Sequence, residues 1–113
     1  MPGLYMTDFV VDIAKFVEQP NMTTIMKIEE YCQATDSPAS VSTSNKFELI
    51  RIRDGFARDN LELDSVVAEK GINRVCDIMI DAYPKWRVTF FYLLAEVTGS
   101  HGNLRPVDSV PND

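Results

Sequence analysis

The feature that most constrains this chain is the run "WRVTFFYLLAEV", residues 86–97, which is dominated by apolar and aromatic side chains. On a helical wheel these side chains cover nearly the whole circumference, and only Arg87, Thr89 and Glu96 interrupt them. A helix that is apolar all round is stable in water only where other segments or another chain cover it. The run therefore predicts a helix onto which much of the protein packs.

Two arrangements would cover this helix. It is either the central helix of a bundle, or one of its two apolar stripes contacts a second chain. Aromatic residues are enriched at interface hot spots, and a chain of this size has few elements with which to surround a helix. The residues that we single out as interface candidates are Trp86, Val88, Phe91 and Tyr92.

The ends of the run favour a helix over a strand. Residues 87–97 contain several β-forming residues, and a strand there would change the fold class to α+β. Pro84 suits the first turn of a helix, and Gly99 suits its C-terminal end. We favour the helix because these two residues enclose a helix of ordinary length.

Two further helices are expected near the N-terminus. Apolar residues recur at helical spacing from Phe9 onward, Pro20 ends the first helix, and Asn21 is a suitable N-cap for the second. This pattern predicts an antiparallel helical hairpin over residues 8–34. The small polar residues of 36–45 predict a flexible linker.

Residues 46–98 are expected to form the helical core of the chain. The first part of this segment is ambiguous, because its apolar residues fit both a strand and a helix face. A strand hairpin about Asp54 and Gly55 would place Arg51 opposite Arg58, which is an unfavourable like-charge pair. We therefore favour a helix there too.

Residues 63–82 allow two interpretations. Asp59 and Glu62 have the spacing of a capping box; alternatively, Asp64 caps a short helix. Gly71 is suited to end this helix, after which a second helix follows. This order resembles the helix-turn-helix of small transcriptional regulators, with Asn73 and Arg74 as the DNA-contacting residues. Acidic residues on the second helix would then face the DNA phosphates and be repelled. DNA binding is therefore the alternative and not the first choice.

These patterns together predict an all-α protein. We expect a compact bundle of five to six short helices, forming a single domain over residues 1–99. At 113 residues the chain is long enough to bury a core without metal or disulfide staples. Residues 100–113 contain little to bury and are expected to form a disordered C-terminal tail.

The charge of the chain limits the classes of partner that it can bind. Its net charge is −6, and none of its segments is strongly basic. Nucleic-acid binding depends on neutralising phosphates, so a protein partner with a basic surface fits better. The sequence has neither a signal-peptide pattern nor an apolar run of the roughly 20 residues that a bilayer requires. We therefore expect a cytoplasmic protein without a membrane segment.

The sequence offers little material for catalysis or for binding a cofactor. Cys32 and Cys76 are predicted to be buried free thiols, and the single histidine, His101, falls in the expected tail. Neither a phosphate-binding glycine loop nor a serine-nucleophile motif is present. We expect no catalytic residue, no metal ligand and no cofactor.

The sequence therefore predicts a small, acidic, non-enzymatic helical protein that acts through protein–protein contacts, including contacts between its own copies. In kind it is similar to adaptors, assembly chaperones and inhibitors, such as those that phages or mobile elements encode. The alternative is a helix-turn-helix DNA-binding regulator that uses residues 63–82.

Overall fold

The structure is a computed structural model that describes residues 6–104, with side chains from residue 8 onward. Within this range it contains five α-helices: α1 (Met6–Ile13), α2 (Met22–Ala34), α3 (Lys46–Ile52), α4 (Ser65–Ile78) and α5 (Arg87–Thr98). A π-helical segment, η1 (Arg53–Asn60), continues α3, and a 3-10 turn, η2 (His101–Asn103), follows α5. The predicted all-α class is confirmed.

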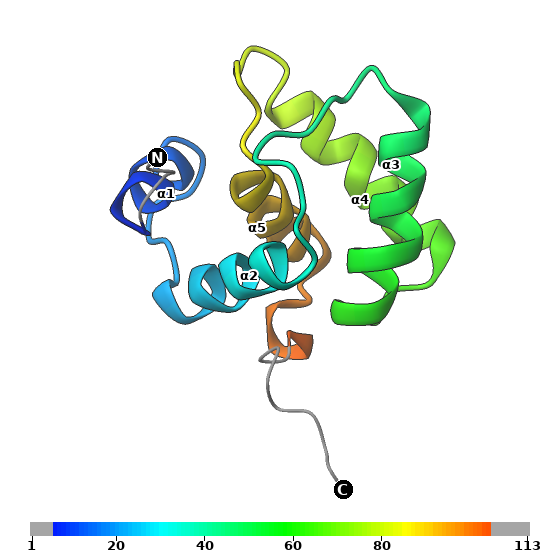
Figure 1. Ribbon diagram of the computed structural model, residues 1–113, viewed down its shortest axis with the longest axis horizontal. Helices are drawn as coiled ribbons and strands as arrows, with labels where there is room; N and C mark the ends of the chain where they lie inside the picture. The colour runs from blue at the N-terminus through cyan, green and yellow to red at the C-terminus, as the bar shows by residue number, and fades with distance from the viewer. Residues whose placement is uncertain (1–5, 105–113) are drawn as a thin grey trace, which may run out of the picture.

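Helix α5 is the centre of the fold. It contacts α1, α2 and α4, and Figure 1 shows it between α1 on one side and α4 with α3 on the other. Every residue from 87 to 95 is buried. Of the two arrangements considered for this run, the structure shows the first, in which the chain covers its own apolar helix. The radius of gyration, 13.1 Å, is that of a compact chain of this length.

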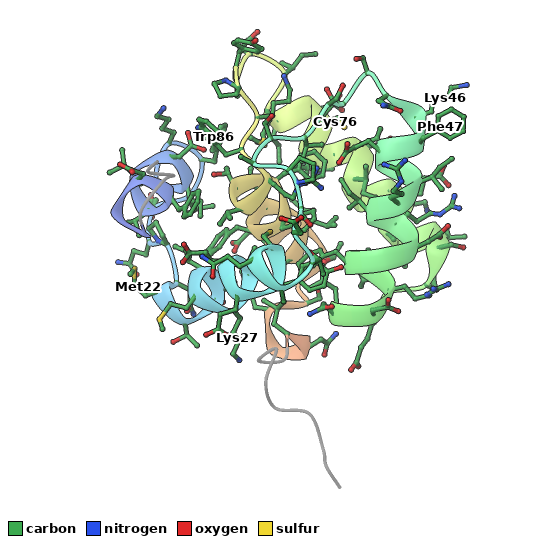
Figure 2. The ribbon with its side chains drawn as sticks, in the orientation of Figure 1. Met22, Lys27, Lys46, Phe47, Cys76 and Trp86 are labelled. Atoms are coloured by element: carbon green, nitrogen blue, oxygen red, sulfur yellow. The ribbon has the colours of Figure 1, made fainter. Side chains whose placement is uncertain are left out.

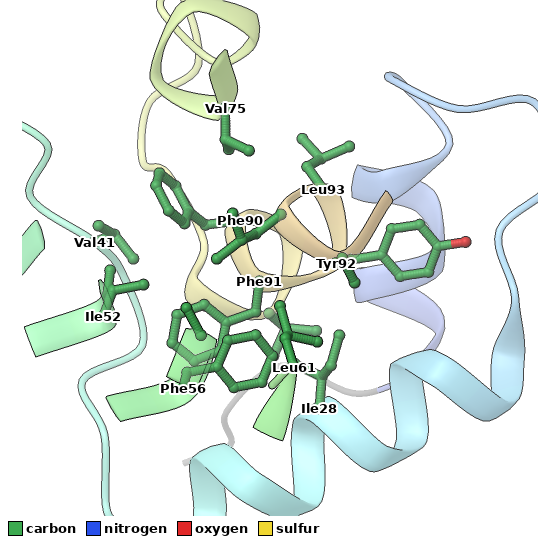
Figure 3. Close-up of a cluster of buried hydrophobic side chains, with 14 of the residues drawn as sticks. Ile28, Val41, Ile52, Phe56, Leu61, Val75, Phe90, Phe91, Tyr92 and Leu93 are labelled. Atoms are coloured by element: carbon green, nitrogen blue, oxygen red, sulfur yellow. The ribbon is translucent and has the colours of Figure 1, made fainter. Parts of the chain in front are cut away.

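The core is organised around consecutive side chains of α5. Figure 3 shows Phe90, Phe91, Tyr92 and Leu93 leaving the helix in different directions, each toward a different part of the bundle. Phe91 stacks on Phe56 of η1, with ring centroids 4.0 Å apart. This contact explains why residues 46–60 are helical, as predicted: a helix brings Ile52 and Phe56 onto the face that meets α5.

Three predicted helix ends are confirmed. The side chain of Asn21 accepts a hydrogen bond from the Thr24 N–H at the start of α2. The carboxylate of Asp64 accepts from the N–H groups of Val66 and Val67 at the start of α4. Gly99 ends α5 with a φ of 64°, a conformation that residues with a Cβ rarely adopt.

The predicted helix end at Gly71 is wrong. Helix α4 runs without interruption from Ser65 to Ile78, and Gly71 is buried within it. A Cβ atom at this position would lie 2.8 Å from Cγ2 of Thr98 and 2.9 Å from Cδ1 of Leu94. The glycine therefore allows α4 and α5 to approach closely, and residues 63–82 do not contain the turn that a helix-turn-helix requires.

The start of α5 and the first hairpin also differ from the prediction. Helix α5 begins at Arg87, so Pro84 lies in the preceding loop, after a cis peptide bond with Tyr83. In Figure 1, α1 and α5 are seen nearly end-on whereas α2 lies across the view. Helices α1 and α2 therefore cross and do not form an antiparallel hairpin.

The linker over residues 36–45 is a loop, as predicted, but its middle is held against the core. The Val41 N–H donates to the Lys85 carbonyl at 2.8 Å, and the Arg87 N–H donates to the Ala39 carbonyl at 2.7 Å. The Val41 side chain is buried. Backbone groups of residues 39–41 therefore pair with the loop that leads into α5, a contact that the prediction of a flexible linker did not include.

The boundary of the C-terminal tail was placed too early. Ser100 and Leu104 are buried, and the Asn103 amide donates to the Leu61 carbonyl at 2.7 Å. Residues 100–104 therefore belong to the folded part of the chain. The rest of the predicted tail, residues 105–113, and residues 1–5 of the predicted domain lie outside the described residues.

Candidate functional site

Three of the four predicted interface residues are covered by the chain itself. Val88, Phe91 and Tyr92 are buried. The hydroxyl oxygen of Tyr92 accepts a hydrogen bond from the Asn21 N–H at 2.8 Å, and Phe91 is part of the aromatic stack in the core. These three side chains stabilise the fold. They are not accessible to a partner at the surface of the folded chain.

The fourth predicted residue, Trp86, lies at the surface. It is half-buried directly before α5, and Figure 2 shows it between α1 and the loop over residues 79–86. It lines a cavity of about 540 Å³, which we call the Trp86 cavity. The cavity is formed by three segments, namely the end of α1 with the turn after it, the end of α4, and the loop before α5. Its lining residues are Asp12, Lys15, Phe16, Ile78, Asp81, Ala82, Tyr83, Pro84 and Trp86.

The rim of the Trp86 cavity carries more negative than positive charge. Asp12 accepts a hydrogen bond from the hydroxyl of the fully buried Thr89 at 2.5 Å, which fixes the position of its carboxylate. The Lys15 ammonium lies 3.4 Å from the same carboxylate and is mostly exposed. Asp81 adds a second, exposed carboxylate. Two carboxylates and one ammonium therefore share the cavity with the aromatic side chains of Phe16, Tyr83 and Trp86.

Tyr83 is the most exposed large side chain at this cavity, with 95% of its surface accessible. Together with Pro84 it also lines a neighbouring cavity of about 340 Å³, formed mainly by residues 40–44 of the linker. Burying an aromatic ring of this size against an apolar partner stabilises a complex. The Tyr83 ring is therefore available to such a partner from both cavities.

A buried arginine fixes the backbone next to Trp86. Arg87 is only 5% exposed, and its guanidinium donates to the Pro38 carbonyl at 2.6 Å, to the Ser40 carbonyl at 3.2 Å and to the Glu48 carboxylate. Its Cζ atom lies 5.6 Å from the centre of the Phe91 ring. An isolated antiparallel bridge between Ser40 and Trp86 adds to these contacts. The edge of the cavity is therefore pre-organised by the fold.

The nucleophilic side chains lie elsewhere. Both cysteines are partly buried, and burial raises the pKa of Cys32 to about 12 and also raises the pKa of Cys76. Both thiols therefore keep their protons at neutral pH. The imidazole of His101 is 2.7 Å from the Glu96 carboxylate and packs edge-on against the Tyr92 ring. In the part of the chain that the structure describes, His, Cys, Asp and Glu form no group of three that could hold a metal ion.

Residues 8–101, from α1 to the first residue of η2, match the family described as "Protein of unknown function (DUF2853)". The chain belongs to this family. The match includes all of the residues that line the Trp86 cavity. No curated protein matches the chain.

The two residues predicted for DNA binding, Asn73 and Arg74, are exposed on α4 of this member of the DUF2853 family. Asn73 lies on the rim of a groove between α3 and α4. The helix-turn-helix motif would need a turn at Gly71, directly before these residues, but α4 is continuous there. None of the helices in residues 6–104 is long and apolar enough to cross a membrane.

Sequence reasoning missed most residues of the Trp86 cavity. The signal was the segment "DAYPKW", residues 81–86, which puts two aromatic residues and a proline into a short loop between helices. Aromatic rings in a loop do not belong to the buried face of either neighbouring helix. Such rings therefore indicate a separate contact surface. Asp12 and Phe16 had no such signal, because both also fit an amphipathic helix.

Proposed function

We propose that this chain is a non-enzymatic, cytoplasmic adaptor or inhibitor that binds a segment of a partner protein in the Trp86 cavity. The segment presents an apolar side chain to Trp86 and Tyr83, and next to it a lysine or arginine to Asp81 and Asp12. The observation that carries the proposal is the almost complete exposure of Tyr83 at a cavity of about 540 Å³ that Phe16 and Trp86 also line.

The residue types at the cavity support a protein partner. Trp and Tyr are the residues most often found at interface hot spots, because each buries a large area at a low cost in conformational entropy. Here Pro84 lies in the short segment between the two residues and restricts its backbone. A site with rigid aromatic anchors loses little entropy on binding.

The charges support a basic segment. Asp12 is held in place by Thr89 and Lys15, so its carboxylate needs no reorganisation when a cation approaches. Asp81 is exposed and belongs to a chain with a net charge of −6. Complementary charge at the rim of an interface increases the rate of association and excludes acidic partners.

The chemistry of the nucleophilic groups supports a role without catalysis. A thiol whose pKa is raised to about 12 is a poor nucleophile at neutral pH, and this is the state of Cys32. The single histidine is engaged by Glu96 and lies on η2, away from the residues that line the Trp86 cavity.

A selection from a random peptide library tests the proposal. The single tryptophan of the chain lines the cavity, so its fluorescence reports binding at this site directly. We expect the selected peptides to share an apolar residue next to a lysine or arginine, and to change the Trp86 emission. Tyr83→Ala should weaken their binding at least tenfold, which corresponds to about 1.4 kcal/mol.

Phe47→Ala is the matched control, because Phe47 is also an exposed aromatic residue but lies on α3, away from the cavity. It should leave peptide affinity unchanged. The proposal fails if the selected peptides share no basic residue, or if the two alanine variants weaken binding equally.

A further inference from the structure

A second surface lies on the opposite side of α5 from α1, where α3 and α4 run side by side (Figure 1). A groove of about 250 Å³ separates the two helices. Its residues are Lys46, Leu49, Ile50, Arg53, Glu69, Ile72 and Asn73. Ile72 is buried at the base, Leu49 is partly buried, and the charged residues form the rim.

Two large apolar side chains of α3 are exposed on this surface: Ile50 lines the groove, and Phe47 follows the lining residue Lys46 in the sequence. Phe47 is 72% exposed and Ile50 is 42% exposed. In Figure 2, Phe47 points away from the core at the start of α3, beside Lys46. A phenylalanine ring left in water forgoes the favourable free energy of its burial, so the face is suited to association.

The charge of this face differs from that of the rest of the chain. Helices α3 and α4 with η1 contain six basic and five acidic residues, whereas the remainder contains five basic and twelve acidic residues. Two copies of a chain with a net charge of −6 repel each other over most of their surfaces. The face of α3 and α4 is where the charges nearly cancel, and two copies can meet there without this repulsion.

The charged groups of the groove are also arranged in a self-complementary way. Lys46 and Arg53 lie on the α3 side, and Glu69 lies on the α4 side. Arg53 is paired with the adjacent Asp54, whereas Lys46 and Glu69 form no salt bridge within residues 6–104. A two-fold axis that places α3 of one copy against α4 of the other brings opposite charges together twice.

We propose that two copies of this chain associate through the groove between α3 and α4, with Phe47 of each copy entering the groove of the other. The volume is sufficient, because a cavity of roughly 150 Å³ already accommodates benzene and the groove offers about 250 Å³. Lys46 of each copy faces Glu69 of the other. The groove and the Trp86 cavity share no residue, so this inference does not depend on the proposed function.

The test is the mass of the full chain in solution, measured by sedimentation equilibrium from micromolar to millimolar concentration. We expect a dimer that dissociates on dilution. Phe47→Ala should raise the dissociation constant at least tenfold without changing the thermal midpoint of the monomer, since little of this ring is buried there. Tyr83→Ala, the matched exposed aromatic, should associate like the parent chain.

A pair of charge-reversal variants distinguishes a specific contact from non-specific association. Lys46→Glu and Glu69→Lys should each weaken the dimer, because each puts like charges opposite one another, and the double variant should restore it. A parent chain that stays monomeric throughout overturns the proposal and leaves the groove to a different protein. Single variants that associate like the parent, or a double variant that is no better than either single one, overturn it as well.

Discussion

The first turn of α5 and the remainder of the same helix are both buried, yet they are held in different ways. From Phe90 to Ala95 the helix is surrounded by apolar side chains of the other helices. In the first turn, Arg87 and Thr89 are equally inaccessible but bind polar partners, namely the 38–40 backbone, Glu48 and Asp12.

This difference shows two ways in which a sequence specifies a structure. Apolar burial can be inferred from one helix alone, because any apolar neighbour will cover it. A buried polar group needs one particular partner, and the partners of Arg87 and Thr89 lie between 39 and 77 residues away along the chain. The apolar part therefore sets the fold class, and the polar turn selects which loop packs where.

The largest effect is expected in the apolar part. Phe90→Ala removes a fully buried ring and should lower the free energy of unfolding by about 3–5 kcal/mol. Denaturant unfolding followed by circular dichroism measures this loss. Phe47→Ala, which removes an exposed ring of the same size, should change the stability of the monomer by less than about 0.5 kcal/mol. Equal losses in the two variants would mean that Phe90 is not the core residue described here.

A somewhat smaller effect is expected in the polar turn. Arg87→Met leaves the Glu48 carboxylate without its partner and should cost about 3 kcal/mol, the lower end for a broken buried pair, because Glu48 is still 15% exposed. Adding Glu48→Met should recover about 1–2 kcal/mol, since no buried charge then remains. Phe90→Ala should gain nothing from Glu48→Met. If the double variant loses as much free energy of unfolding as the two single variants lose together, Arg87 and Glu48 are not coupled and the polar turn is not held as proposed.

The smallest effect concerns Cys32, which lines a pocket together with Arg87 and Val88 of the first turn. Burial raises its folded-state pKa from 9.0 to about 12, whereas Arg87 acts in the opposite direction. The folded state therefore holds the thiol proton where the unfolded chain releases it, and stability should fall as the pH rises from about 9 to about 12.

Chemical unfolding of the parent chain and of Cys32→Ala over this pH range measures the contribution of this one thiol. The parent should lose more stability than the variant, although Tyr31, whose pKa burial also raises, adds a slope of the same sign to both. Identical slopes would show that the Cys32 thiol is as well solvated in the folded chain as in the unfolded one.

Much of the fold could be predicted because its signals are local. Asn21, Asp64 and Gly99 cap helices through groups that belong to the same turn. Gly71 was misjudged because a glycine at a helix end and a glycine at a close helix crossing look the same in sequence. Only the positions of Leu94 and Thr98 distinguish the two roles.

The candidate site was predictable only in part. Trp86 was found from its place in the apolar run, but Val88, Phe91 and Tyr92 were equally apolar and are consumed by the core. Which of these residues reach the surface depends on how many helices surround α5. A helical wheel of α5 alone gives no information on its neighbours. Asp12 became part of the site through its contact with Thr89, a pairing across 77 positions.

The central position of α5 has a consequence for how the chain is made. This helix is synthesised after the other four α-helices, and Tyr92 binds the N–H of a residue 71 positions earlier. At a translation rate of about 5–20 residues per second, roughly 3–13 s separate the completion of α2 from that of α5. During that interval α1 and α2 can contact each other, but they lack the central helix on which both of them pack. The packing of α1, α2 and α4 onto a common helix is therefore complete only once α5 has been synthesised.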